Sequence, residues 1–218
     1  MAEISPAILT NDISDFRIKY AELFALSHHF RKLHVDFADG QFVNNQTIMP
    51  HDLKFLKSSP FILMAHFMTF KPQKYFWDAK KAGFKWVLVH YEAFEDSDEL
   101  DHVLEHARSM HFKVGIVLNP ETPLHKAAKF IQKVDCVQLM CIEPGFQGRE
   151  FMPSTLDRIK ELRDLMKHAI IAVDGGVKVG IAHKLAKAGA DVIVAGSAIV
   201  KSYNRKTAIE ALKEDIEL

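Results

Sequence analysis

Residues 169–197, with the sequence AIIAVDGGVKVGIAHKLAKAGADVIVAGS, contain the pattern that decides the fold. Two short apolar runs rich in β-branched residues, at 169–173 and 191–195, enclose a longer amphipathic stretch at 178–189. Strands that alternate with helical stretches in this way are typical of parallel β-α-β units. Gly189 closes the middle stretch, where glycine commonly ends a helix. The segment therefore predicts a strand, a helix and a second strand.

The same alternation continues along the whole chain. We expect strands at eight apolar runs, whose starts lie 22 to 34 residues apart: 4–9, 31–36, 61–66, 85–90, 112–118, 135–140, 169–173 and 191–195. Helical stretches between the strands include 72–83 and 153–168. A final one follows the last strand at 206–217, where Ala208, Leu212 and Ile216 share one face. Eight such repeats predict a single-domain (β/α)8 TIM barrel over residues 1–218. The competing fold is a doubly wound open sheet, which normally has fewer strands and a G-x-G-x-x-G motif that is missing after the first run here.

Composition argues against several classes of protein. The chain has 218 residues with 28 Lys+Arg and 28 Asp+Glu, so its formal charge is zero and we expect no nucleic-acid partner. No apolar run approaches the roughly 20 residues of a membrane-spanning helix, so we expect no membrane association. Cys136 and Cys141 form neither a C-x-x-C motif nor a disulfide framework. A reducing, cytoplasmic setting is therefore the default expectation.

Polar residues stand at the carboxyl ends of several predicted strands. His34 and Asp36, two residues apart on the second strand, point to one face, while His66 ends the third strand and Asp174 the seventh. Each residue alone is explained by a turn or a hydrogen-bonded histidine. A barrel, however, brings all four to one mouth, where two buried carboxylates need compensation. One divalent cation bound by the four side chains supplies it. His90 ends the fourth strand, and the sequence leaves open whether it lines the same pocket.

Glycine-rich segments follow the last three predicted strands. They are Gly145, Phe146, Gln147 and Gly148 after the sixth, Gly175 and Gly176 after the seventh, and Gly196 and Ser197 after the eighth. Glycine permits close approach to bare backbone N–H groups, and TIM barrels often bind phosphate at the loops after strands 7 and 8. An ordinary turn explains one such segment, but three consecutive loops favour a phosphate site.

Longer motifs extend this pattern over most of the chain. They are Leu33-His34-Val35-Asp36, Asp39-Gly40-Gln41-Phe42-Val43, His66-Phe67-Met68, Val117-Leu118-Asn119-Pro120-Glu121-Thr122-Pro123, Glu143-Pro144-Gly145-Phe146, Val173-Asp174-Gly175-Gly176-Val177 and Ala188-Gly189-Ala190-Asp191. Together they resemble the ribulose-phosphate 3-epimerase family from Ile4 to about Ser202. The resemblance implies a barrel of the ribulose-phosphate-binding type and a carbohydrate isomerase of the pentose phosphate pathway. It also implies a homo-oligomer.

The resemblance assigns roles to individual residues. His34, Asp36, His66 and Asp174 match positions that bind one divalent metal ion, and this ligand set accepts Zn²⁺, Fe²⁺, Mn²⁺ or Co²⁺. Asp36 and Asp174 also match the two acid–base groups. The implied reaction inverts C3 of D-ribulose 5-phosphate to give D-xylulose 5-phosphate. One aspartate removes a proton, which leaves an enediolate, and the other delivers a proton to the opposite face.

The resemblance further implies which residues surround the substrate. The three glycine-rich segments match loops that hold the phosphate, and we expect Met68, Met140 and Ala7 to line the pocket. The chain departs from the family pattern here: Ala7, Ala38, Asn44 and Met64 stand where the family commonly has serine, methionine, proline and aspartate.

These departures leave alternatives open. The substrate is D-ribulose 5-phosphate or a ketohexose 6-phosphate such as allulose 6-phosphate. A non-catalytic sugar-phosphate-binding barrel is a further alternative, although the intact histidines and aspartates argue against it. A related decarboxylase would carry Asp-x-Lys-x-x-Asp after the second strand, but Ala38 and Gln41 occupy two of those positions.

Overall fold

The computed structural model describes residues 2–166 and 169–218. Its eight strands pair in parallel in sequence order, and β1 also pairs with β8, so the sheet closes into a barrel. The strands are β1 (Glu3–Ile8), β2 (Lys32–Ala38), β3 (Ile62–Met68), β4 (Trp86–His90), β5 (Lys113–Leu118), β6 (Cys136–Met140), β7 (Ile170–Asp174) and β8 (Val192–Ala195). The predicted TIM barrel is confirmed, and each strand begins within one residue of its predicted start.

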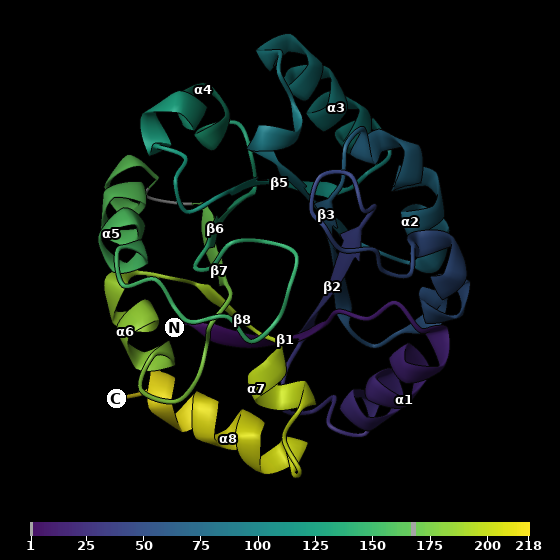
Figure 1. Ribbon diagram of the computed structural model, residues 1–218, viewed down its shortest axis with the longest axis vertical. Coiled ribbons are helices and arrows are strands. Elements are labelled where there is room, and N and C mark those ends of the chain that lie inside the picture. Colours follow the sequence, from purple (N-terminus) through teal and green to yellow (C-terminus); the bar gives the residue numbers. More distant parts are fainter. Residues whose placement is uncertain (1, 167–168) are drawn as a thin grey trace.

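Helices surround the barrel and cover its outer face (Figure 1). The α-helices are α1 (Ile13–Phe24), α2 (Phe76–Ala82), α3 (Ser97–Ser109), α4 (Ala128–Ile131), α5 (Thr155–Leu165), α6 (Ala182–Ala188), α7 (Ser197–Val200) and α8 (Arg205–Ile216). Short 3-10 helices are η1 (Pro50–Ser58), η2 (Pro72–Tyr75), η3 (Tyr91–Ala93) and η4 (Leu124–Ala127). Within the described ranges, no helix combines the length and apolar character that crossing a membrane requires.

The predicted helical stretches differ from the observed helices at their ends. The stretch 72–83 begins as η2, continues as α2 and ends at Gly83, whose φ of 93° stops the helix. The stretch 178–189 becomes helical only at α6, after Gly180 with its φ of 83°. The stretch 153–168 is represented by α5, and its last two residues, 167 and 168, lie outside the described residues.

The last helix buries residues beyond those of its predicted apolar face. Ala208 and Ile216 are only partly buried, and the buried residues of α8 are Ile209, Leu212 and Asp215. The Asp215 carboxylate accepts hydrogen bonds from the backbone N–H groups of Gly180 (2.8 Å) and His183 (2.9 Å). A buried aspartate is invisible to an apolar pattern, although here it ties α8 to the start of α6.

Alternate strand residues point into the barrel and form an inner core. Its members are Ala7, Met64, Trp86, Leu88, Val117, Cys136, Met140, Ile142, Ala172, Val192 and Val194. Gly115 makes room for this packing, because a Cβ atom there would lie 2.5 Å from Leu88 Cδ2. Buried polar residues at the strands' carboxyl ends give the barrel a polar mouth: His34, Asp36, His66 and His90.

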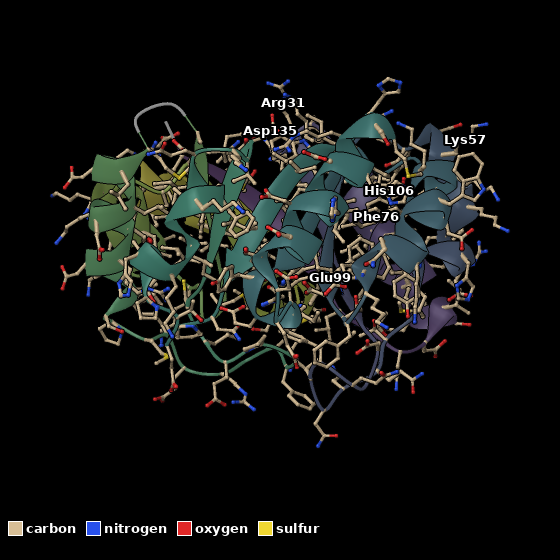
Figure 2. The ribbon with its side chains drawn as sticks, turned by 90° about the horizontal axis from the view of Figure 1, so that it is seen from above. Arg31, Lys57, Phe76, Glu99, His106 and Asp135 are labelled. Atoms are coloured by element: carbon tan, nitrogen blue, oxygen red, sulfur yellow. The ribbon has the colours of Figure 1, made fainter. Side chains whose placement is uncertain are left out.

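Figure 2 shows the two ends of the barrel from the side. Arg31 and Asp135, which directly precede β2 and β6, lie at one end, and Glu99 in the first turn of α3 lies nearer the other. Loops that follow the strands extend from that second end. The polar mouth therefore opens among these loops.

Candidate active site

The polar mouth brings His34, Asp36, His66 and Asp174 together. β2 and β3 pair with Asp36 beside His66, and the two-residue spacing places His34 on the same inward face. Asp174 ends β7, which is separated from β2 by β8 and β1. One nitrogen or oxygen atom from each residue lies within 4.8 Å of the atoms offered by the other three. We call these four residues the His₂Asp₂ cluster.

Distances within the His₂Asp₂ cluster suit a shared cation. His34 Nε2 lies 3.2 Å from Asp36 Oδ1 and 3.7 Å from Asp174 Oδ2. His66 Nδ1 lies 2.8 Å from Asp36 Oδ1 and 3.5 Å from Asp174 Oδ2. Both histidines are fully buried, and among the described residues neither ring nitrogen of His34 has a hydrogen-bond partner. Because a buried nitrogen without a partner is costly, these residues fit a divalent ion that accepts the free lone pair.

The two carboxylates of the cluster differ in their affinity for protons. Burial would raise the pKa of Asp36, but its close contacts with His34 and His66 outweigh burial and hold that pKa below its usual value. Burial and the negative charge of Asp36 raise the pKa of Asp174 to about 6. Neighbouring carboxyl groups with pKa values pushed apart are typical of an acid and a base that work together.

A pocket opens beside the His₂Asp₂ cluster and contains most of the predicted substrate residues. Its lining includes Asp36, His66, Asp174, Met68, Met140, Gly145, Phe146, Gln147, Gly148, Gly175, Gly176, Gly196 and Ser197. Four apolar residues that the sequence did not indicate complete it: Leu9, Ile142, Val177 and Val194. An apolar residue at a strand end has the same pattern as a core residue, which is why these four were missed.

Ala7 is the predicted pocket residue that the structure places elsewhere. It is 1% exposed and belongs to the inner core of the barrel. The pairing of β1 with β2 sets Ala7 beside His34, which is likewise not among the lining residues. Ala7 therefore lies at the level of His34, below the pocket surface.

Glycine brings the backbone close to neighbouring side chains where the three loops meet. At Gly175, with φ 111°, a Cβ atom would lie 2.3 Å from Ile142 Cγ1. At Gly196 it would lie 2.4 Å from Gln147 Nε2, so the Gln147 amide packs directly over this backbone. Gln147 Nε2 is buried and has no hydrogen-bond partner among the residues described. A donor without a partner thus faces the glycine-lined part of the pocket.

The loops that follow β2 and β6 contact each other at the mouth. Asn45, after β2, donates a hydrogen bond from Nδ2 to the carbonyl oxygen of Gly145 at 2.6 Å. A Cβ atom at Gly145 would lie 3.0 Å from Val43 Cβ. The chain segment after β2 therefore packs on the glycine-rich segment after β6, which lines the pocket.

His90 lies behind His66. Its Nε2 is 2.9 Å from His66 Nε2, and its Nδ1 is 3.3 Å from a carboxylate oxygen of Glu92. Phe42 packs against the His90 ring with centroids 4.7 Å apart. Glu92 was not predicted as a site residue, although a carboxylate two residues after a strand-end histidine is a signal that could have revealed it.

The two cysteines are not nucleophiles of this site. Cys136 and Cys141 are both free and buried. Burial raises the pKa of each thiol to about 12, so both are protonated at neutral pH.

The fold and the cluster together define a class of protein, the TIM-barrel enzymes that carry their chemistry at the carboxyl ends of the strands. Within this class, the chain belongs to the ribulose-phosphate 3 epimerase family, whose model matches residues 3–200. The chain is 31% identical over 219 residues to the ribulose-phosphate 3-epimerase of Schizosaccharomyces pombe, covering 99% of this chain and 94% of the relative. It is 33% identical to the ribulose-phosphate 3-epimerase of Bacillus subtilis strain 168, covering 98% and 99%.

More distant solved structures share the fold. A tryptophan synthase α-subunit from Pyrococcus furiosus superimposes with a TM-score of 0.75 at 16% identity, covering 99% of this chain and 98% of that one. The 3-hexulose-6-phosphate synthase of Salmonella typhimurium gives a TM-score of 0.71 at 14% identity, covering 99% and 98%. At these identities the likeness extends to the barrel and no further.

Proposed function

We propose that the protein is a metal-dependent epimerase that inverts C3 of a ketose phosphate and interconverts D-ribulose 5-phosphate and D-xylulose 5-phosphate. The observation that carries the proposal is the meeting of Asp36 and Asp174, from β2 and β7, in one glycine-lined pocket. Relatives along nearly the whole chain are named ribulose-phosphate 3-epimerases. Those names favour the five-carbon substrate over allulose 6-phosphate and over a non-catalytic binder.

Inversion of a carbon requires proton transfer on two faces, and this proposal assigns one carboxylate to each face. Asp36 directs Oδ1, and Asp174 directs Oδ2, toward the histidines of the cluster. Asp36 Oδ2 and Asp174 Oδ1 are thereby left for proton transfer. One carboxylate removes the C3 proton, and the other delivers a proton to the opposite face. The reverse reaction exchanges their roles.

His34, Asp36, His66 and Asp174 would hold the metal ion. When bound, a divalent ion supplies a Lewis acid that stabilises negative charge on the substrate oxygens next to C3. Zn²⁺, Fe²⁺, Mn²⁺ and Co²⁺ all suit this mixture of imidazole and carboxylate ligands, and cellular supply selects among them. Metal analysis of the purified protein identifies the ion.

The glycine-rich residues would bind the substrate phosphate. Gly175, Gly176 and Gly196 bring backbone close to the pocket, and the Gln147 amide adds a side-chain donor. Binding energy from the distant phosphate fixes C3 between the two carboxylates. Met68 and Met140 form an apolar wall beside them, which excludes water from the reacting carbon.

The proposal extends to the whole chain. Residues 1–218 form one epimerase domain that works in the cytoplasm as a homo-oligomer. Buried free cysteines are compatible with a reducing compartment. Exposed apolar residues on the outer helices, Phe24 in α1 and Trp77 in α2, offer surface for association between copies.

Deuterium exchange tests the two-base mechanism. We expect Asp36→Asn and Asp174→Asn each to lower epimerisation of ribulose 5-phosphate by at least about 1,000-fold, because each removes one proton-transfer group. Exchange at C3 is followed by NMR in D₂O, with metal content measured in the same samples. Asp157→Asn is the matched control, since Asp157 is 85% exposed on α5 and remote from the pocket. Substantial epimerisation by both active-site variants would exclude the mechanism.

A further inference from the structure

The two nitrogens of His66 face different surroundings. Nδ1 points into the His₂Asp₂ cluster, 2.8 Å from Asp36 Oδ1 and 3.5 Å from Asp174 Oδ2. Nε2 points away from the cluster and lies 2.9 Å from His90 Nε2. Both rings are fully buried, so water does not compete for this contact. His66 can bind a cation only through Nδ1, and only if Nδ1 carries no proton.

The contact between the two histidines has a direction. Two neutral imidazole nitrogens 2.9 Å apart share one proton, which belongs to either His66 or His90. If it is on His66 Nε2, then His66 Nδ1 is bare and ready for a cation. If it is on His90 Nε2, then His66 carries its proton on Nδ1, where it blocks the cation. Asp36 Oδ1, 2.8 Å from His66 Nδ1, favours a proton on Nδ1 while no cation is bound, and the tautomer of His90 decides whether His66 Nε2 has an acceptor that opposes this.

Glu92 determines the tautomer of His90. Its Oε2 lies 3.3 Å from His90 Nδ1, and a carboxylate can only accept, so Nδ1 must carry the proton. With the opposite tautomer, a bare nitrogen would face a carboxylate oxygen in a buried site, which is unfavourable. His90 Nε2 is then the acceptor for the proton on His66 Nε2. Glu92 thus favours a proton on His90 Nδ1, and His90 in turn favours a proton on His66 Nε2.

Glu92 is itself held in place from the β5 side. Its Oε1 accepts hydrogen bonds from the Asn119 backbone N–H at 2.8 Å and from the Thr122 hydroxyl group. The Arg158 guanidinium on α5 donates to the carbonyl oxygens of Asn119, Pro120 and Thr122 at 3.0, 2.7 and 2.7 Å. These contacts fix which oxygen of Glu92 faces His90.

We propose that His90 and Glu92 are positioning residues that hold His66 in the tautomer with a bare Nδ1 and so prepare the His₂Asp₂ cluster for its divalent cation. This inference rests on the metal centre of the proposed function. It adds two residues beyond the cluster whose effect reaches the metal only through His66. Outer partners of ligand histidines typically change metal affinity roughly 10- to 100-fold.

Glu92→Gln tests whether Glu92 sets the tautomers of His90 and His66. The Asn119 N–H requires an oxygen, so the new amide turns its NH₂ group toward His90 Nδ1. That NH₂ group requires a bare His90 Nδ1, which reverses both tautomers and places a proton on His66 Nδ1. We expect Zn²⁺ affinity, measured by competition with a chromophoric chelator, to fall roughly 10- to 100-fold. Imidazole ¹⁵N NMR of the metal-free proteins should show a smaller fraction of His66 in the Nε2–H form in Glu92→Gln than in wild type.

Two variants of His90 provide a second route that does not depend on Glu92→Gln. His90→Phe keeps a ring of similar size but accepts no proton, so Zn²⁺ affinity should fall by the same factor. His90→Gln accepts from His66 Nε2 and donates to Glu92, so it should retain most of the affinity. Glu210→Gln is the matched control, because Glu210 pairs with His29 at 3.9 Å on the surface, far from the cluster.

The outcomes separate this inference from the proposed function. If Glu92→Gln and His90→Phe bind Zn²⁺ as tightly as wild type, and the Nε2–H fraction of His66 is unchanged, the positioning role of Glu92 and His90 is overturned while the metal centre stands. If the wild-type protein binds no divalent cation, the metal centre and the positioning role are overturned together.

Discussion

Gly175 and Gly180 have similar backbone conformations in very different surroundings. Their φ values are 111° and 83°, both in the region that favours glycine. A Cβ atom at Gly175 would lie 2.3 Å from Ile142 Cγ1, whereas at Gly180 it would meet nothing within 4 Å. The pair therefore separates the cost of backbone strain from the cost of overpacking the pocket wall.

Alanine substitution at these two positions should destabilise the protein to different extents. We expect Gly180→Ala to lower the free energy of unfolding by about 1–2 kcal/mol, the cost of the left-handed backbone. Gly175→Ala should cost about 1–3 kcal/mol more, because Ile142 must also move. Urea denaturation of the metal-free proteins measures both values. Equal losses would mean that the pocket wall yields freely at Ile142.

Among individual residues, the sequence predicted the His₂Asp₂ cluster but not the contacts of His90 and Glu92 behind it. Asp36 and His66 are brought together by strand register alone, and register follows from the positions of the apolar runs. The role of Glu92 depends on its distance from His90 and on which hydrogen-bond donor each of its two carboxylate oxygens contacts. Neither is encoded in local spacing. Ala7 was misplaced for a similar reason, since its depth in the barrel depends on pairing with His34.

Elements differ in how strongly local sequence specifies them. The strands were predicted closely because β-branched apolar runs bounded by polar residues have few alternative conformations. The 3-10 helix η1 was not predicted, because Leu53 departs from helical angles within an otherwise helical segment. The start of α6 was predicted too early, because Gly180 adopts a positive φ that composition does not reveal.

The contact between α6 and α8 leads to a prediction for Asp215. Its carboxylate satisfies two backbone N–H groups at the start of α6 that lack helical partners. We expect Asp215→Ala to lower the free energy of unfolding by about 1–2 kcal/mol, as for loss of a helix cap. Asp215→Asn retains an acceptor oxygen and should lose less than half as much. Thermal or urea unfolding measures the difference, and equal effects of the two variants would contradict a capping role.

The molecule as a whole should gain stability from the cation that its mouth is built to hold. An ion that binds only the folded chain adds about 2.7 kcal/mol at 100 times its Kd, which for a domain of this size raises Tm by roughly 5 to 10 °C. We expect this shift for Zn²⁺ added to metal-free wild type and to Asp157→Asn. Asp174→Asn, which lacks one ligand of the cluster, should show little or none. Calorimetry measures the shift, and a full response from Asp174→Asn would place the ion elsewhere.

The order of the strands around the barrel has a consequence for how the protein matures. The residues of the His₂Asp₂ cluster come from β2, β3 and β7, so most of the chain separates the first from the last. A chain still attached to the ribosome lacks a complete set until β7 has emerged from the exit tunnel. Ion capture is thus a late event in biogenesis, and newly made protein that has taken up its ion has already assembled nearly all of its barrel.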